Sequence, residues 1–405
     1  MNTLKFGNGE WYGKKDTILA YNDENSNYKP LPFNFERDSS ATVVNKDGLI
    51  ETVSAGMPRI DYKDNSKGAL LLEPSRTNSL PYSANFSTWS ATGGASVIGD
   101  KLGVGGSNDA FEFFSDGTAN TRLYYALSNT GELSFSVFAK KNTLDYIALY
   151  GNGGANPRVW FNLANGTLGN QEGAGTGSIE SYGNGWYRCT MNWTSASLVN
   201  VRIYNSNEND VFGGTAGSVF MQYAQLEAGS YATSYIPTSG STATRLADSC
   251  LKEDINTSII NSSYPFSMYA ESTYIGGNKN VLSFSKKVVS NNYYQITINT
   301  NEVMLDARAN GSTELIESGV TLLDGQKFKV AVTMESATSG KICVNGSTVV
   351  SKTNFSNQAV NNEINDLLLG QLRVPYDTGE RLPVTDVKLY NTALTDQELI
   401  ALTQV

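Results

Sequence analysis

Short apolar runs recur along the whole chain, and turn-forming residues such as glycine, asparagine, serine and proline separate them. The clearest run is Leu133–Ala139, LSFSVFA, in which apolar and small polar residues alternate. In a strand this alternation sends Leu133, Phe135, Val137 and Ala139 to one face and Ser134, Ser136 and Phe138 to the other. We expect the first face to be buried and the second to be half exposed. The pattern predicts a protein built from β-strands.

The composition agrees with an all-β protein. The 405 residues include 38 Gly and 22 Tyr, and charged residues make up only 17% of the chain. Aromatic residues are enriched in strands, whereas disordered chains are rich in charge and poor in aromatic residues. The length indicates two or three domains, each large enough to bury its own core.

Net charge and hydropathy exclude two classes of partner. The formal net charge is −9 and the sequence pI is about 4.8, whereas binding nucleic acid through its phosphates requires a basic face. A run of 18 apolar residues, which would insert into a membrane, is absent from the sequence. The start, MNTLKFGNGEWYGKKD, lacks the pattern of a secretory signal. We therefore expect release inside the cell that makes the protein.

Histidine and cysteine usage argues against an enzyme. The chain has no histidine, which removes the Ser-His-Asp triad, the Cys-His pair and HExxH zinc sites. The three cysteines, Cys189, Cys250 and Cys343, are far apart and odd in number. We interpret them as buried, neutral thiols rather than as a disulfide framework or a metal site.

Residues 1–80 are predicted to form a strand-and-turn region without a core of its own. The turn Asn45–Gly48 is of the kind that joins hairpin strands, and Glu73-Pro74 should end the apolar run before it, because proline cannot donate to a ladder. The strands predicted here are Thr3–Phe6, Thr17–Tyr21, Ala41–Val44, Ile50–Val53 and Ala69–Leu72.

Residues 81–247 are predicted to form a first β-sandwich, followed by a linker at Thr238–Asp248 that is rich in Ser, Thr and Gly. Asn184-Gly185 is a strong hairpin signal. The predicted strands are Ala110–Phe114, Leu133–Ala139, Tyr146–Tyr150, Val159–Leu163, Trp186–Trp193, Leu198–Tyr204 and Val219–Leu226.

Residues 248–405 are predicted to form a second β-sandwich that ends in a short helix, and residues 250–405 are predicted to fold alone. Thr395 and Glu398 form a Thr-x-x-Glu capping box at the start of that helix. The predicted strands are Phe266–Ala270, Val281–Phe284, Tyr293–Asn299, Val303–Ala307, Lys327–Met334, Lys341–Val344, Thr348–Val350, Leu367–Leu369 and Thr385–Tyr390.

Two phrases bracket the first predicted sandwich. They are GALLLEPSRTNSLPYSANFSTW at Gly68–Trp89 and QYAQLEAGSYATSYIPTSGSTATRLAD at Gln222–Asp248. Both resemble phrases around such modules in the fibre and virion proteins of tailed bacteriophages. The resemblance implies a structural virion protein assembled in the cytoplasm of a host bacterium. It also implies capsid or tail partners, a homotrimer, and an anchoring or oligomerisation role for residues 1–80.

Each sandwich carries a resemblance of its own. GNGWYRCTMNWT and YAQLEAGSYATSYIPT make residues 81–247 similar to a jelly roll of the carbohydrate-binding-module type. FKVAVTM, GKICVNGSTVV and DVKLYNTALTDQELIAL make the last third similar to the laminin-G/concanavalin-like jelly roll, with Phe328 where that family often has Trp. The resemblances imply lectin-like domains. Trp186 could stack on a sugar, but we interpret it as a core residue whose N–H is solvated.

The loop from Arg373 to Arg381, RVPYDTGER, is the candidate carbohydrate-binding site. Tyr376 can stack on a sugar ring, while Arg373, Asp377 and Arg381 can hydrogen-bond hydroxyls or a sugar carboxylate. The alternative is an ordinary solvated connection or a subunit contact. If this loop does not bind, the Asn/Gly loop at Gly151–Arg158 is the next candidate.

No cofactor is expected from the sequence. Asp366, Asp377 and Asp386 could offer oxygens to a Ca²⁺ ion, as in some laminin-G domains, but we interpret them as solvated loop acids and assign no metal. Glu208 and Asp210 form an E-x-D pair without a third carboxylate at the glucanase spacing, since that position is Gly214.

The function that these observations favour is display of lectin-like domains by a non-enzymatic virion protein, on the head or the tail, for adhesion to host-surface glycans. One alternative is a phage glycan depolymerase, which would have to use carboxylates, Tyr or Lys. The other is a bacterial glycan-binding adhesin, which would require a secretory signal.

Overall fold

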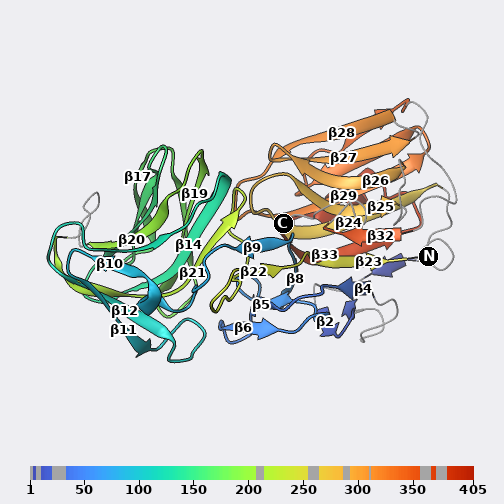
Figure 1. Ribbon diagram of the computed structural model, residues 1–405. Coiled ribbons are helices and arrows are strands. Elements are labelled where there is room, and N and C mark those ends of the chain that lie inside the picture. Colours follow the sequence, from blue (N-terminus) through green and yellow to red (C-terminus); the bar gives the residue numbers. More distant parts are fainter. Residues whose placement is uncertain are drawn as a thin grey trace. The chain divides into compact units, whose positions relative to one another are not determined.

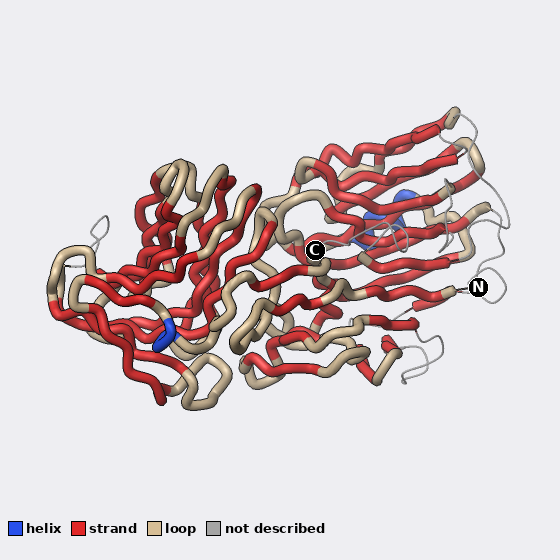
Figure 2. The backbone as a smooth tube through the Cα atoms, viewed as in Figure 1, coloured by secondary structure: helices blue, strands red, loops and turns tan. Residues whose placement is uncertain are grey.

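The computed structural model describes residues 3–5, 11–20, 33–206, 214–253, 264–285, 292–309, 312–355, 366–370 and 381–405. Strands dominate both parts of the chain (Figures 1 and 2). The chain divides into two compact units. We call the unit made of residues 47–52 and 76–245 the inserted unit, and the unit made of residues 1–46, 53–75 and 246–405 the outer unit. The prediction of an all-β, sandwich-like protein is confirmed.

The inserted unit contains two antiparallel sheets, each with six strands in the described residues. The β15 sheet runs in the order β10 (Ser90–Thr92), β13 (Arg122–Ala126), β20 (Asn200–Ser206), β15 (Tyr146–Asn152), β16 (Arg158–Asn162) and β17 (Thr167–Glu172). The β14 sheet runs in the order β11 (Ala95–Lys101), β12 (Ala110–Asp116), β21 (Ala216–Ala228), β14 (Gly131–Lys141), β19 (Trp186–Ser195) and β18 (Thr176–Ser181). A short 3₁₀ helix, η1 (Phe86–Thr88), precedes β10. One core cluster contains residues from both sheets.

Strand β14 alternates as its sequence predicts, but both of its faces are buried. Leu133, Phe135, Val137 and Ala139 belong to the main core of the inserted unit. Ser134, Ser136 and Phe138, expected to be half exposed, are each about 1% exposed. A second apolar cluster, which contains Phe138, Trp186 and Tyr235, lies on that face. The expectation that this face is half exposed is wrong, because residues outside the neighbouring strands, such as Tyr235, pack against it.

A β-bulge in β21 links the two phrases that bracket this unit. The pairing of β14 with β21 shifts register between Ser136 and Phe138, and Tyr223 in the bulge has a left-handed φ of 52°. The bulge frees the Ala224 backbone from the ladder. Its N–H donates to the Ser83 carbonyl at 2.8 Å, and its carbonyl accepts from Asn78 Nδ2 at 3.3 Å.

Asn78 acts as a four-way hydrogen-bonding centre inside this unit. Its Nδ2 also donates to the Ile236 carbonyl at 2.9 Å. Its Oδ1 accepts from the backbone N–H groups of Leu80 at 3.2 Å and Leu226 at 3.1 Å. The side chain is fully buried, so each of these bonds satisfies a group that has no access to water. The first and second phrases are thus joined by buried polar contacts.

Replacing Asn78 by aspartate is expected to lower the free energy of unfolding by at least about 2–3 kcal/mol, because two donors are lost and a charge is buried among carbonyl groups. Urea unfolding followed by tryptophan fluorescence reports on this unit, which holds Trp89, Trp160, Trp186 and Trp193. The matched control is Asn85→Asp, since Asn85 is an exposed N-cap that aspartate serves equally well. Equal stability of the two variants would contradict the role given to Asn78.

The predicted linker at Thr238–Asp248 is not a free linker. Its residues 243–245 form β22 (Ala243–Arg245), which pairs with β9 (Arg76–Asn78). Thr238 and Arg245 are buried, and Thr238 Oγ1 donates to the Leu80 carbonyl. The Ser/Thr/Gly composition was misleading because these hydroxyls pair with buried backbone groups rather than with water.

The outer unit is a second sandwich of two antiparallel sheets. In spatial order, the β24 sheet contains β31 (Val350–Thr353), β30 (Ser339–Val344), β29 (Lys327–Ser336), β24 (Phe266–Thr273), β33 (Leu382–Tyr390), β8 (Ala69–Leu72) and β7 (Ile60–Asp61), and β1 (Thr3–Lys5) also pairs with β33. The β26 sheet contains β2 (Trp11–Lys14), β3 (Thr17–Ala20), β4 (Phe33–Glu36), β23 (Ser249–Lys252), β32 (Asp366–Leu369), β25 (Lys279–Ser285), β26 (Tyr293–Asn299), β27 (Glu302–Ala309) and β28 (Ser312–Thr321). Strands β5 (Ala41–Val44) and β6 (Ile50–Val53) form a two-stranded sheet that is part of neither of these two sheets.

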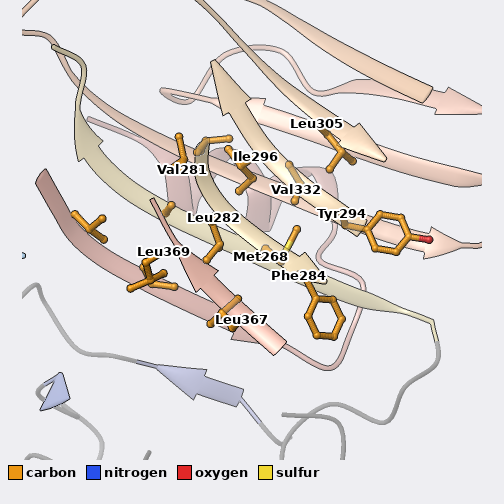
Figure 3. Packing of buried hydrophobic residues seen from close by; sticks show 14 of the residues in the cluster. Met268, Val281, Leu282, Phe284, Tyr294, Ile296, Leu305, Val332, Leu367 and Leu369 are labelled. Atoms are coloured by element: carbon orange, nitrogen blue, oxygen red, sulfur yellow. The ribbon is translucent and has the colours of Figure 1, made fainter. Parts of the chain in front are cut away.

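The core of the outer unit lies between its two sheets. Figure 3 shows Met268 and Val332 of the β24 sheet together with Leu282, Ile296 and Leu369 of the β26 sheet. All five side chains are 1% exposed or less. This burial follows from the alternation of the strands, because every second residue faces the opposite sheet.

The first 75 residues do not form a region of their own. Strand β8 pairs with β33, with Leu70 opposite Val384 and Leu72 opposite Leu382, and β4 pairs with β23. The side chains of these strands lie in the same core cluster as the rest of the outer unit. The predicted boundary at residue 80 is therefore wrong, because partners about 300 positions apart cannot be recognised from local composition. The anchoring role of this region stays a prediction.

Several local predictions are confirmed. Helix α1 (Asp396–Thr403) begins with the capping box of Thr395 and Glu398. Asn184 and Gly185 both have positive φ, as a hairpin turn of this type requires. Strand β8 ends at Leu72, directly before Glu73-Pro74.

The three cysteines are buried and unpaired, as predicted. Burial in an apolar surrounding raises the pKa of the Cys189 and Cys250 thiols above the usual range. These thiols are therefore neutral packing groups. In the described residues, no helix is long and apolar enough to span a bilayer.

Candidate functional site

The outward side of the β15 sheet carries a row of aromatic residues. Neighbouring side chains on a strand point to opposite faces, so Leu123, Ile147, Leu149, Val159 and Ile203 enter the core. Their alternates point away from that core: Tyr124, Tyr146, Tyr150, Trp160 and Tyr204. We call this set the aromatic face.

The register of the strands brings these residues together. Ala148 lies opposite both Trp160 and Tyr204, and Tyr150 lies opposite both Arg158 and Arg202. Side chains directly opposite each other on adjacent strands are in contact distance. Ala148, Trp160 and Tyr204 accordingly form a small apolar cluster of their own, with Tyr146 and Tyr150 packed at its side.

Guanidinium and amide groups are interleaved with the rings. The Arg202 guanidinium carbon lies 4.9 Å from the centroid of the Tyr150 ring, and that of Arg158 lies 5.9 Å from the same centroid. Arg202 Nε donates to Asn200 Oδ1 at 2.8 Å. These contacts hold the arginines over an aromatic ring, where cation–π attraction stabilises them.

The remaining rings of the face are also fixed by neighbours. Asn162 Nδ2 donates to the Tyr146 hydroxyl at 2.9 Å. Tyr150 and Tyr204 meet edge to face, with centroids 6.2 Å apart. A preorganised surface of this kind loses little side-chain entropy when a ligand binds.

The aromatic face has a buried floor and a partly exposed rim. Trp160 and Tyr204 are 1% and 3% exposed, whereas Tyr124, Tyr146, Tyr150 and Arg202 are partly exposed. Aromatic rings offer an apolar surface to the C–H faces of a sugar, and tyrosine hydroxyls, amides and guanidinium groups hydrogen-bond its hydroxyls.

The structure describes one of the four residues predicted to bind carbohydrate. Arg373, Tyr376 and Asp377 lie outside the described residues, as do Glu208 and Asp210. Their roles stay predictions.

Arg381 is described, and it is partly buried in an ion pair. Its Nε lies 3.3 Å from Glu73 Oε1, and the Arg381 side chain is 16% exposed. This ion pair links Arg381, directly before β33, to Glu73, directly after β8. Arg381 therefore stabilises the outer unit.

Trp186 is a core residue, as predicted. It is 3% exposed and packs with Val104, Phe138 and Tyr235. Arg188 lies on the same face of β19, where its Nη2 donates to Ser136 Oγ at 2.9 Å and its guanidinium carbon lies 5.4 Å from the Phe138 centroid.

The aromatic face was not predicted from the sequence, although three of its four strands were; β13, which carries Tyr124, was not. The signal is the second set of alternating residues in YIALYGN, RVWFN and NVRIYNS, which is aromatic and basic where a solvated face would be small and polar. The register between the strands places these residues next to one another, and the sequence of a single strand does not reveal that register. The second predicted loop, Gly151–Arg158, joins the two strands that carry Tyr150 and Arg158.

The acids considered for a metal site are not gathered. Asp366 lies in β32 and Asp386 lies in β33, on different sheets, and Asp377 lies outside the described residues. Across the part of the chain that the structure describes, no group of three or more His, Cys, Asp or Glu side chains could hold a metal ion.

Comparison with known families identifies the second sandwich. Residues 249–400 match the family model Laminin_G_3, described as the concanavalin A-like lectin/glucanases superfamily. The matched segment agrees with the resemblance seen in the sequence of the last third. No curated protein matches the chain.

Solved structures that resemble the chain include carbohydrate-binding domains. The Ruminococcus gnavus IT-sialidase CBM40 bound to α2,3-sialyllactose is 14% identical, with a TM-score of 0.32 over 37% of this chain and 91% of that chain. Domain 4 of the Geobacillus stearothermophilus arabinanase AbnA, in complex with arabinotriose, is 17% identical. Its TM-score is 0.30, and the match covers 44% of this chain and 83% of that domain. The NanB sialidase of Streptococcus pneumoniae is 20% identical. Its TM-score is 0.30, and the match covers 34% of this chain and 23% of the sialidase chain. By the family match alone, residues 249–400 form a concanavalin-like domain.

Proposed function

We propose that this protein is a non-enzymatic carbohydrate-binding protein and that the aromatic face of the inserted unit binds the glycan. The observation that carries the proposal is the convergence of Tyr146, Tyr150 and Arg202 on one preorganised sheet surface. A sugar lies against the partly exposed rim that Tyr146 and Tyr150 form, and its hydroxyls accept hydrogen bonds from Arg202. The buried Trp160 and Tyr204 support these groups from below.

We further propose that the protein displays this surface on the virion of a tailed bacteriophage, as part of a head or tail fibre or decoration. The support is the likeness of the phrases at Gly68–Trp89 and Gln222–Asp248 to those of such proteins. A homotrimer bound to capsid or tail partners would present several copies at once. Several weak contacts to a host-surface glycan then combine into avid adhesion.

The full-length protein is expected to bind host-cell glycan, and Tyr150→Ala combined with Arg202→Ala is expected to weaken that binding at least about tenfold. The loss follows because aromatic and arginine anchors carry most of the binding energy at such surfaces. Binding is measured as adsorption of labelled protein to host cells and on a glycan array. The control is Tyr12→Ala, which removes a tyrosine that is 55% exposed in the outer unit.

Two results would contradict the proposal. Unchanged adsorption by the folded double variant would remove the aromatic face as the site. Sustained release of reducing ends from host polysaccharide would favour a depolymerase over a binding protein. Labelling of purified phage particles with an antibody to this chain tests the virion location.

A further inference from the structure

A polar cavity of about 350 Å³ lies in the outer unit, on the side of the β24 sheet that faces away from the core. Strands β24, β29 and β33 form its floor, and residues before β8 and the end of α1 complete its wall. Its volume falls within the range of about 300–1,000 Å³ that small-molecule sites occupy. The lining residues that carry the argument are Lys67, Tyr269, Glu271, Lys327, Lys329, Asp386 and Lys388. We call it the lysine pocket.

The pairing of three adjacent strands explains why these residues meet. Glu271 of β24 lies opposite Lys329 of β29 and opposite Asp386 of β33. Two positions along, Tyr269 lies opposite Lys388. Opposed residues on neighbouring strands share a face, so the sheet itself arranges the charged groups as a fixed grid.

The charge of the lysine pocket is opposite to that of the whole chain. The pocket is lined by four ammonium groups and two carboxylates, those of Lys67, Lys327, Lys329, Lys388, Glu271 and Asp386. The whole chain, in contrast, has a net charge of −9. An excess of ammonium groups in a concave site attracts an anionic ligand.

Several of these groups are already held in place. Lys388 Nζ lies 2.7 Å from Asp386 Oδ2 and 4.7 Å from the centroid of the Tyr269 ring. The Tyr269 hydroxyl donates to Glu271 Oε2 at 3.1 Å. Lys329 Nζ, which has three N–H donors, donates one hydrogen bond to the Gln404 carbonyl at 2.6 Å.

One buried oxygen in the pocket has an unmet hydrogen-bonding capacity. Asp386 is 3% exposed, and no described residue donates a hydrogen bond of ordinary geometry to its Oδ1. A buried acceptor without a donor is costly, and such groups in native structures usually mark a ligand or water position. Burial raises the pKa of Asp386 to about 6, and the neighbouring Lys388 ammonium opposes that rise.

We propose that the lysine pocket binds an acidic sugar residue, with its carboxylate among the lysines and one of its hydroxyls donating to Asp386 Oδ1. A sulfate ion would satisfy the ammonium groups but has no proton for Asp386, and a neutral sugar would leave the ammonium groups without an anion. A uronic acid supplies both functions on one ring. This site is separate from the aromatic face and does not depend on it.

The test measures binding of three probes to the full-length protein by isothermal titration calorimetry: methyl glucuronide, methyl glucoside and sodium sulfate. We expect the glucuronide to bind at least tenfold more tightly than either of the others. Lys327→Gln combined with Lys329→Gln should weaken glucuronide binding at least tenfold. The matched control, Lys14→Gln with Lys15→Gln, removes the same charge from exposed positions of the same unit and should leave binding unchanged.

Asp386→Ala separates the acidic sugar from a simple anion. It should weaken glucuronide binding while leaving sulfate binding equal or stronger, because a carboxylate is removed. Equal binding of glucuronide and glucoside, or sulfate binding as tight as glucuronide binding, would overturn the proposal. The variant Tyr150→Ala with Arg202→Ala should retain glucuronide binding here, so failure of the aromatic face and failure of the lysine pocket are distinguished.

Discussion

Replacing Asp248 by alanine is expected to lower the free energy of unfolding of the outer unit by about 3–5 kcal/mol, since removing one partner of a buried ion pair leaves the other charge uncompensated. Asp248 Oδ1 accepts from Arg37 Nη1 at 3.0 Å, and its Oδ2 accepts from the Glu73 backbone N–H at 2.9 Å and from Arg59 Nη2. The side chains of Asp248, Arg37, Arg59 and Glu73 are all 0% exposed.

Denaturant unfolding followed by far-UV circular dichroism measures this loss. Asp64→Ala is the control, because the Asp64 side chain is 69% exposed and its Oδ2 lies 3.8 Å from Lys63 Nζ. Exposed ion pairs contribute only about 0–1 kcal/mol to the free energy of unfolding. Asp248→Asn keeps one of the two oxygen acceptors without the charge and should lose less than alanine does. A loss from Asp248→Ala no larger than that from the control would refute the structural weight given to this ion network.

A fragment of residues 246–405 is expected not to fold cooperatively. It lacks Phe33, Phe35, Leu70 and Leu72, which are 2% exposed or less in the outer core. Burying each such side chain contributes about 1.5–3 kcal/mol, and the sum is comparable with the whole stability of a domain, about 5–15 kcal/mol. This replaces the sequence expectation that the last third folds alone.

The fragment experiment has a built-in comparison. Residues 76–245 contain both sheets of the inserted unit and should give a cooperative thermal transition by tryptophan fluorescence. Supplying residues 1–75 by co-expression should restore soluble outer unit. A sharp transition from residues 246–405 alone would show that the N-terminal strands are dispensable.

Much of the fold could be predicted from the sequence where strands are apolar. Ala41–Val44, Ala69–Leu72 and Tyr293–Asn299 are strands with the predicted bounds. Strands β17 and β18, TLGNQE and TGSIES, were not predicted because they lie at sheet edges, where polar residues are tolerated and alternation is weak. Local pattern finds buried strands far better than exposed ones.

The site was harder to predict than the fold for a different reason. Tyr150 and Arg202 are about 50 positions apart, and only the β15–β20 register places them opposite each other. The same holds for Glu271 and Asp386 in the lysine pocket. From the sequence, binding residues are expected in loops, whereas both proposed sites are built on strand faces, which hold their side chains more rigidly than loops do.

The pairing of β8 with β33 also sets an order of events during synthesis. Leu70 and Leu72 leave the ribosome about 300 residues before Val384 and Leu382, their partners in the ladder. At roughly 5–20 residues per second, the early strands wait some tens of seconds for them. The inserted unit is complete by residue 245 and can fold in that interval. The outer sandwich is therefore completed last, after the inserted unit has folded.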